Sequence, residues 1–223
     1  MKKLLLSSGL VFLTSFIFRI FHLPFSNLIA FLAIVLVLIF AVIHSFKKEK
    51  VWGINLLATW LIFFWSYYLF TRYLFWSSGP GILGFNALFI LTFIASILYV
   101  VQTYAKKEVS KIVVGLSILG ISISFVPGHV ISYFFNLNEW VNKENNKINF
   151  KSWDEYSWFL YIYGDKERAL DANHKAMEAW NYRNKVNPSS SPYFQEIPAI
   201  IKEHEKGIIN DSWTDSYLIY VEL

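Results

Sequence analysis

The sequence predicts an all-α protein: a five-helix transmembrane bundle followed by a small extracytoplasmic helical domain. Two observations predict it. Hydrophobic side chains make up 55% of the 223 residues and charged ones only 16%, whereas a soluble domain carries about 25% charged residues. The charge is also divided unevenly. Residues 1–136 hold ten basic and two acidic side chains, a net charge of +8, and residues 137–223 hold ten basic and fourteen acidic ones, a net charge of −4.

Five apolar stretches account for the first part of the chain. A helix that crosses a bilayer needs about 20 predominantly apolar residues, and the stretches that qualify are residues 4–23, 27–46, 51–76, 82–104 and 112–136. Polar or turn-forming residues separate them, such as the SSGPG sequence between the third and the fourth. Together they predict a transmembrane bundle over residues 1–136.

Lysines flank this bundle in a regular way. They cluster before the first stretch, between the second and third, and between the fourth and fifth: Lys2, Lys3, Lys47, Lys48, Lys50, Lys106, Lys107 and Lys111. Because basic residues in short loops stay cytoplasmic, the pattern predicts a cytoplasmic amino terminus and an extracytoplasmic chain after residue 136. A cleaved signal peptide over residues 1–20 is the alternative. It would leave four helices, but Arg19 and the absence of an Ala-x-Ala site argue against it.

The fifth stretch carries small residues on one helical face, namely Ser117, Gly120, Ser124 and Gly128. In lipid, small residues let helices approach closely. This face therefore packs inside the bundle or forms a seam for a partner subunit. Pro127, next to Gly128, predicts a kink or an end of the helix there.

Four ionisable residues lie near the predicted outer ends of these helices: Arg19, His22, Arg72 and His129. Charged groups inside a membrane are costly and often functional. Two guanidinium groups and two imidazoles at similar depth predict a site for an anionic headgroup, carboxylate or phosphate. The alternative is that the side chains only reach to the interface. No acidic residue lies within a span, which argues against an ion-coupled motor or pump.

The first two helices resemble the amino-terminal hairpin of the GldL-type motor subunit of bacterial gliding motility and type IX secretion. Gly9, Arg19, His22 and Pro24 occupy the positions of that pattern. Phe25 and the serine after it stand where the family has Gly-Ala, and the family's glutamate in the second helix is missing. The resemblance covers the hairpin alone. It implies a bacterial envelope protein and not motor activity.

Residues 137–151 are rich in Asn and Lys and predict a polar linker before a helical domain at 152–223. Ser152, with Glu155 three residues later, predicts a capping box. A break follows at Gly164 and Asp165, and a second amphipathic helix is expected over 166–183.

This hairpin resembles a single tetratricopeptide repeat. The matching positions are Trp153, Ser157, Gly164, Asp165, Ala169 and Ala176. A single repeat cannot bury its own apolar face. We therefore expect a third helix, over 192–206 and ended by Gly207, to cover it.

The sequence offers no recognisable reaction chemistry. It has no cysteine, its histidines lack metal-ligand spacing, and it contains no nucleophile, P-loop or dinucleotide motif. The acidic pairs of the tail, such as Glu167 and Asp171, follow the pattern of a solvated helix face. No basic stripe with interleaved aromatics points to nucleic acid. We predict no enzymatic activity, no metal and no cofactor.

The leading hypothesis is therefore a multi-pass protein of the bacterial inner membrane that contacts membrane lipid. It would act as an anchor, scaffold or accessory subunit whose extracytoplasmic tail binds a protein partner in the envelope. The alternative is a lipid- or anion-binding protein, for transport or sensing, that uses the outer Arg/His cluster.

Overall fold

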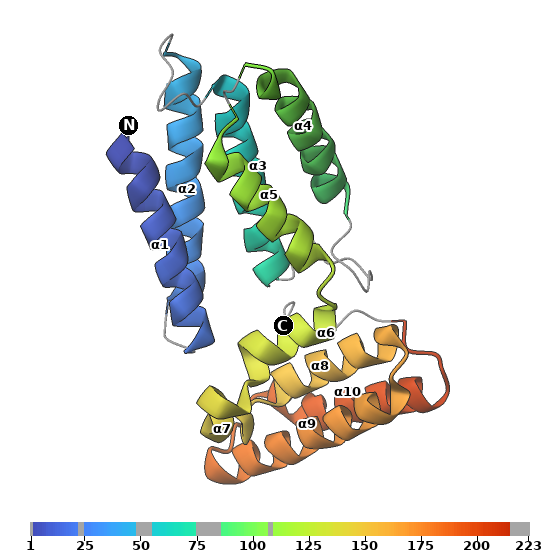
Figure 1. Cartoon of the computed structure of the whole chain (residues 1–223). Coiled ribbons are helices and arrows are strands. Elements are labelled where there is room, and N and C mark those ends of the chain that lie inside the picture. Colours follow the sequence, from blue (N-terminus) through green and yellow to red (C-terminus); the bar gives the residue numbers. More distant parts are fainter. Residues whose placement is uncertain (1, 22–24, 48–54, 75–85, 107–108, 215–223) are drawn as a thin grey trace. The chain divides into compact units, whose positions relative to one another are not determined.

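The computed structural model describes residues 2–21, 25–47, 55–74, 86–106 and 109–214 (Figure 1). These residues form helices and no strand. The predicted all-α class is therefore confirmed for this part of the chain. The chain divides into two compact units, Met1–Val126 and Pro127–Leu223.

The first unit, called the apolar unit here, contains one helix for each predicted stretch. The helices are α1 (Lys2–Ile20), α2 (Ser26–Ser45), α3 (Leu56–Leu74), α4 (Ala87–Tyr104) and α5 (Lys111–Ser124). Among the described residues, α2 and α4 are long and apolar enough to span a membrane. A third span is counted only if α5 and the short helix beyond its break form one crossing. Arg72 and the Trp and Tyr side chains lower the hydropathy of α3. Five crossings therefore remain a prediction.

Helix pairs build the apolar unit: α1 packs on α2, α2 on α3, and α3 on both α4 and α5. Phe40, Leu61, Tyr99 and Val113 form a core cluster with almost no exposed surface. A second cluster gathers around Trp65, Tyr68, Leu69 and Phe89. Asn55 and Asn86 accept hydrogen bonds at 2.8 Å from the backbone N–H groups of Ala58 and Phe89, which caps α3 and α4.

Pro127 ends the stretch that the sequence predicts as one helix over 112–136. Proline has no backbone N–H and cannot continue a helix without a break. The chain accordingly restarts as α6 (Gly128–Ser132) and a π-helical turn, η1 (Tyr133–Leu137). The predicted break is confirmed, but the residues beyond it belong to the second unit. The unit boundary thus lies ten residues before the boundary expected at residue 136.

The predicted linker is not irregular. It holds α7 (Glu139–Asn146) and the start of α8 (Phe150–Tyr163). Asn138 accepts from the Trp140 N–H at 3.1 Å, and Asn149 accepts from the Ser152 N–H at 3.4 Å. The asparagines that suggest a linker therefore serve as helix caps, and Ser152 lies inside α8 instead of capping it.

The second unit, called the polar unit here, is completed by α9 (Lys166–Val186) and α10 (Pro192–Ile209). Gly164 ends α8 with φ 92°, a left-handed conformation that suits glycine, and Asp165 caps α9 by accepting from the Arg168 N–H at 3.2 Å. Helix α9 packs against both α8 and α10, and the three helices lie side by side in Figure 1.

The third helix is present, but Gly207 does not end it. Helix α10 continues to Ile209, and Gly207 leaves room for Trp213, because a Cβ there would lie 2.8 Å from the Trp213 Cβ. Ile197 and Ile201 of α10 are fully buried. Helix α10 thus covers the apolar face of the hairpin, as expected for a single repeat. Whether the hairpin is a tetratricopeptide repeat stays a prediction.

A buried polar network joins the three helices of the polar unit. The Asp154 carboxylate accepts from His204 Nδ1 at 2.8 Å and from Asn173 Nδ2 at 3.2 Å. Asn173 Nδ2 also donates to the Ile201 carbonyl at 3.1 Å. All three side chains are at most 2% exposed, and the His204 ring stacks on Trp213 at 4.3 Å. Because each helix supplies one member, the network fixes their register.

Candidate functional site

The four predicted Arg/His residues are not gathered into one described site. His22 lies outside the described residues. Arg19 lies in the last turn of α1, Arg72 belongs to α3 of the apolar unit, and His129 belongs to α6 of the polar unit. A common anion site built from all four therefore remains a prediction.

Arg72 has a contact that explains its burial. Its side chain is 1% exposed, and Nη2 donates to the Val126 carbonyl at 2.6 Å. Val126 precedes Pro127, so this carbonyl lies where the α5 hydrogen-bond ladder has ended. A cation at the carboxyl end of a helix is also favoured by the helix dipole. Arg72 thus caps the end of α5.

The predicted small-residue face is divided by the break at Pro127. Gly120 and Ser124 are buried against α3: a Cβ on Gly120 would collide with the Trp65 ring, and Ser124 Oγ lies 2.5 Å from the Tyr68 hydroxyl. Gly128 instead packs in the polar unit, where its Cβ would lie 2.9 Å from Phe159. Ser117 is only partly buried. Within the described residues, this face packs helices inside each unit.

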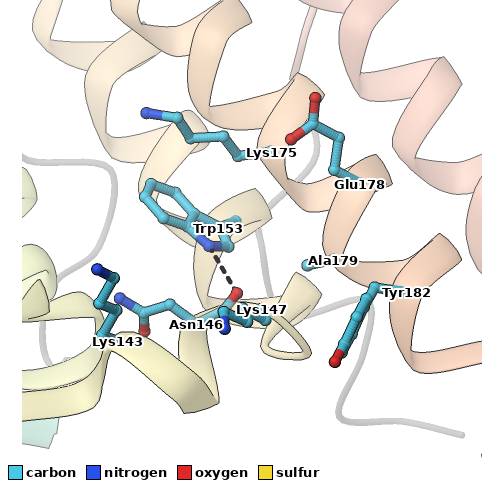
Figure 2. A pocket seen from close by; sticks show the side chains of 8 residues that line it. All are labelled: Lys143, Asn146, Lys147, Trp153, Lys175, Glu178, Ala179 and Tyr182. Carbon is cyan, nitrogen blue, oxygen red and sulfur yellow. Dashed lines mark hydrogen bonds between the residues drawn. The ribbon is translucent and has the colours of Figure 1, made fainter. Parts of the chain in front are cut away.

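The polar unit contains a pocket that the sequence did not reveal. It has a volume of about 470 Å³ and lies where α7, α8 and α9 meet (Figure 2). Its lining combines three lysines, one glutamate and two aromatic rings: Lys143, Asn146, Lys147, Trp153, Lys175, Glu178, Ala179 and Tyr182. The volume is in the range of small-ligand sites, about 300–1,000 Å³.

Trp153 forms the centre of this pocket. Its indole Nε1 donates to the Asn146 carbonyl at 3.1 Å, the dashed line in Figure 2. The ammonium group of Lys175 lies 5.0 Å from the centroid of the ring, within cation–π distance. Asn146 in turn donates from Nδ2 to the Leu137 carbonyl at 2.8 Å. The ring is thus held in place from both α7 and α9.

Ion pairs fix part of the charged rim. Lys147 Nζ lies 2.8 Å and 2.9 Å from the two carboxylate oxygens of Glu144. This hydrogen bond lowers the pKa of Glu144 and raises the pKa of Lys147. Lys175 pairs with Asp171 at 2.9 Å. A lysine ammonium has three donors, so these pairs leave capacity to bind a further acceptor.

A smaller pocket of about 270 Å³ lies beside the first and shares Trp153 and Lys175 with it. Tyr156 and Arg168 line this second pocket and bond to each other, with Arg168 Nη2 donating to the Tyr156 hydroxyl at 2.8 Å. The two pockets form one surface of aromatic faces and cationic groups on either side of the Lys175 side chain, called the Trp153 surface here.

This chemistry suits recognition. Aromatic faces accept apolar or aromatic groups, and ammonium groups accept carboxylates. Among the described residues, no group of three or more His, Asp or Glu side chains is placed to hold a metal ion. The buried His204–Asp154 pair holds the helices together in a core that is closed to solvent.

The sequence alone did not predict the Trp153 surface or the buried network of Asp154, Asn173 and His204. Trp153 matches a repeat position and is one of several aromatic residues of the tail that would suit a protein interface, but the lysines belong to the stretch expected to be a linker and to an ordinary solvated helix face. Asp154 follows Trp153 and precedes Glu155, so it resembles a solvated carboxylate. Only the fold brings His204, fifty residues later, to its side.

The chain was compared with protein-family models, curated proteins and solved structures. No family model, no curated protein and no solved structure matches the chain.

Proposed function

We propose that the chain is a multi-pass protein of the bacterial inner membrane, without enzymatic activity, that acts as an anchor, scaffold or accessory subunit. Its polar unit lies outside the cytoplasm and binds a protein partner. Two observations support the membrane part: α2 and α4 meet the requirements of a span, and large apolar side chains cover the outside of the apolar unit, for example Leu91 and Val101 of α4, 68% and 69% exposed. In water this surface would be costly, whereas lipid would cover it.

The alternating lysine clusters support the orientation. With the amino terminus in the cytoplasm and five crossings, the chain leaves the membrane on the outer side after α5. The polar unit begins there, at Pro127.

The Trp153 surface carries the binding part of the proposal. It offers a buried indole with one edge in a pocket, flanked by the ammonium groups of Lys143 and Lys175 (Figure 2). Aromatic and cationic residues in a concave site are typical of interaction hot spots. The partner that fits is a protein segment with an apolar or aromatic side chain for the Trp153 and Tyr182 rings and a neighbouring carboxylate for the lysines.

Photo-crosslinking in cells tests this function. We would replace Tyr182, which lines the pocket, by p-benzoylphenylalanine. The matched control is Tyr163, an aromatic residue of similar exposure that does not line it, 48% against 49%. We expect a discrete adduct from position 182 and none from 163.

Charge reversal gives this experiment its specificity. Lys143→Glu with Lys175→Glu should remove the adduct, because a partner carboxylate would be repelled, while Lys202→Glu on the exposed face of α10 should leave it unchanged. Equal adducts from both aromatic positions, or an adduct that survives the reversal at the pocket, would contradict partner binding at this surface.

The alternative, a lipid- or anion-binding site that uses Arg19, His22, Arg72 and His129, has weaker support. The hydrogen bond from Arg72 to the end of α5 already gives the most buried of the described groups a structural role.

A further inference from the structure

The segment that opens the polar unit carries large apolar side chains that the described residues leave exposed. Val130 of α6 and Phe134 of η1 are 45% and 44% exposed, and Trp140 of α7 is 96% exposed, more than any other described large hydrophobic residue. Val130 and Phe134 are four residues apart and share a helical face. Other apolar side chains of the segment are buried, among them Ile131 and Phe135.

The rest of the segment is well packed. Gly128 contacts Phe159, Leu137 is fully buried, and Asn142 and Asn146 donate to backbone carbonyls. The segment is therefore fixed in the fold, and its exposed apolar side chains are held in defined positions. Tryptophan and phenylalanine are residues that favour the boundary between lipid and water.

Chain connectivity identifies what covers this face. Val126 is the last residue of the apolar unit, and Val130 follows only four residues later. At about 1.5 Å per residue, α6 and η1 together extend over only about 15 Å. If α5 crosses the membrane, as the proposed function requires, this segment begins at the bilayer surface and stays near it. Segments with an apolar face and a polar face lie in that region, about 5–10 Å into the headgroup boundary.

We propose that α6, η1 and α7 form an interfacial segment, with Val130, Phe134 and Trp140 inserted at the headgroup level of the leaflet in which α5 ends. The inference rests on the proposed membrane crossing. It also has a consequence for the partner site. Lys143, which lines the pocket, follows Trp140 by three residues on the same short helix. The Trp153 surface would therefore face a partner close to the membrane.

The absence of cysteine in the chain makes a direct test simple. Single cysteines would replace Phe134 and Trp140 in the full chain and carry a nitroxide spin label. The protein would be reconstituted in vesicles of phosphatidylethanolamine and phosphatidylglycerol. Collision with oxygen, which concentrates in lipid, would be compared with collision with a water-soluble nickel complex. Leu91→Cys on α4 serves as the lipid reference and Val186→Cys on α9, 64% exposed, as the water reference.

We expect the oxygen-to-nickel collision ratio at positions 134 and 140 to fall between those of the two references and well above that of position 186. If the label at 91 is lipid-exposed while the labels at 134 and 140 match 186, the interfacial segment is refuted and the membrane crossing stands. Exclusion of both reagents from 134 and 140 would show a protein contact and also refute it. A water-exposed label at 91 would instead overturn the membrane crossing itself.

Discussion

The two units place their apolar and polar side chains in opposite ways. In the apolar unit, the outer surface is apolar, and the interior holds many small hydroxyl side chains, which bond to helix carbonyls or to an aromatic residue of a neighbouring helix: Ser8, Ser15, Thr59, Ser96, Thr103 and Ser124. In the polar unit, Phe150, Leu160 and Ile201 form an apolar interior, and the surface carries the charges.

The difference shows which solvent each unit suits. Lipid provides no hydrophobic drive between helices, so close approach and hydrogen bonds between helices take its place. Water provides that drive, so apolar burial holds the polar unit together, and the Asp154 network is a buried polar connection that links its three long helices. If this comparison is correct, removing a buried polar group should cost most in the polar unit, whereas in the apolar unit filling a small residue should cost more than removing a hydroxyl.

The largest effect is expected for Asp154→Ala. The change leaves the buried donors of His204 and Asn173 without their carboxylate. The free energy of unfolding of the polar unit should fall by about 2–5 kcal/mol. Hydrogen exchange of the α10 amides in the full chain measures this loss. Asp171→Ala, which removes only an exposed ion pair, should change it by less than about 0.5 kcal/mol. Equal effects of the two changes would contradict the role of the network.

An intermediate effect is expected for Gly120→Ala. The added methyl group meets the Trp65 ring, and overpacking of this kind costs about 1–3 kcal/mol. Gly115→Ala in the same helix has open space around its Cβ and should stabilise α5 by about 0.5–1 kcal/mol. Titration of the full chain with a denaturing detergent, followed by helical circular dichroism, would separate the two variants. The same sign for both would disprove close packing of α5 on α3.

The smallest effect is expected for Tyr68→Phe, which removes the hydrogen bond to Ser124. Ser124 keeps its bond to the Gly120 carbonyl at 2.6 Å, and such bonds between membrane helices are worth about 0.6 kcal/mol on average. In the same titration, Tyr67→Phe should have no effect, because Tyr67 is 38% exposed. A loss of several kcal/mol for Tyr68→Phe would show that this hydroxyl, and not close packing, joins the two helices.

Much of the fold could be predicted from local signals. Long apolar stretches located the helices of the apolar unit, Pro127 located the break in the fifth, and Gly164 located the turn of the hairpin. Each of these signals depends on one residue, such as Pro127 or Gly164, or on the average hydropathy of a long stretch. The linker prediction failed because residues 137–151 have the composition of a loop, whereas Asn138 and Asn149 in this stretch cap helices.

The site could not be predicted because it depends on contacts across the chain. The Trp153 surface requires α7, α8 and α9 to meet, and the Asp154 network joins residues fifty positions apart. Gly207 shows the same limit: its pattern is that of a helix end, but the packing of Trp213 gives it a place inside α10. The spacing of apolar residues predicts each helix, but it does not predict which other helices pack against it.

The central claim is that the apolar unit spans the membrane and the polar unit lies outside the cytoplasm. Single cysteines at Val186 and at Phe46, 64% and 87% exposed, would be treated with a membrane-impermeant maleimide in intact spheroplasts and again after lysis. The account predicts that position 186 reacts in intact spheroplasts and that position 46, at the cytoplasmic end of α2, reacts only after lysis. Reaction of position 46 but not of position 186 in intact spheroplasts would contradict it.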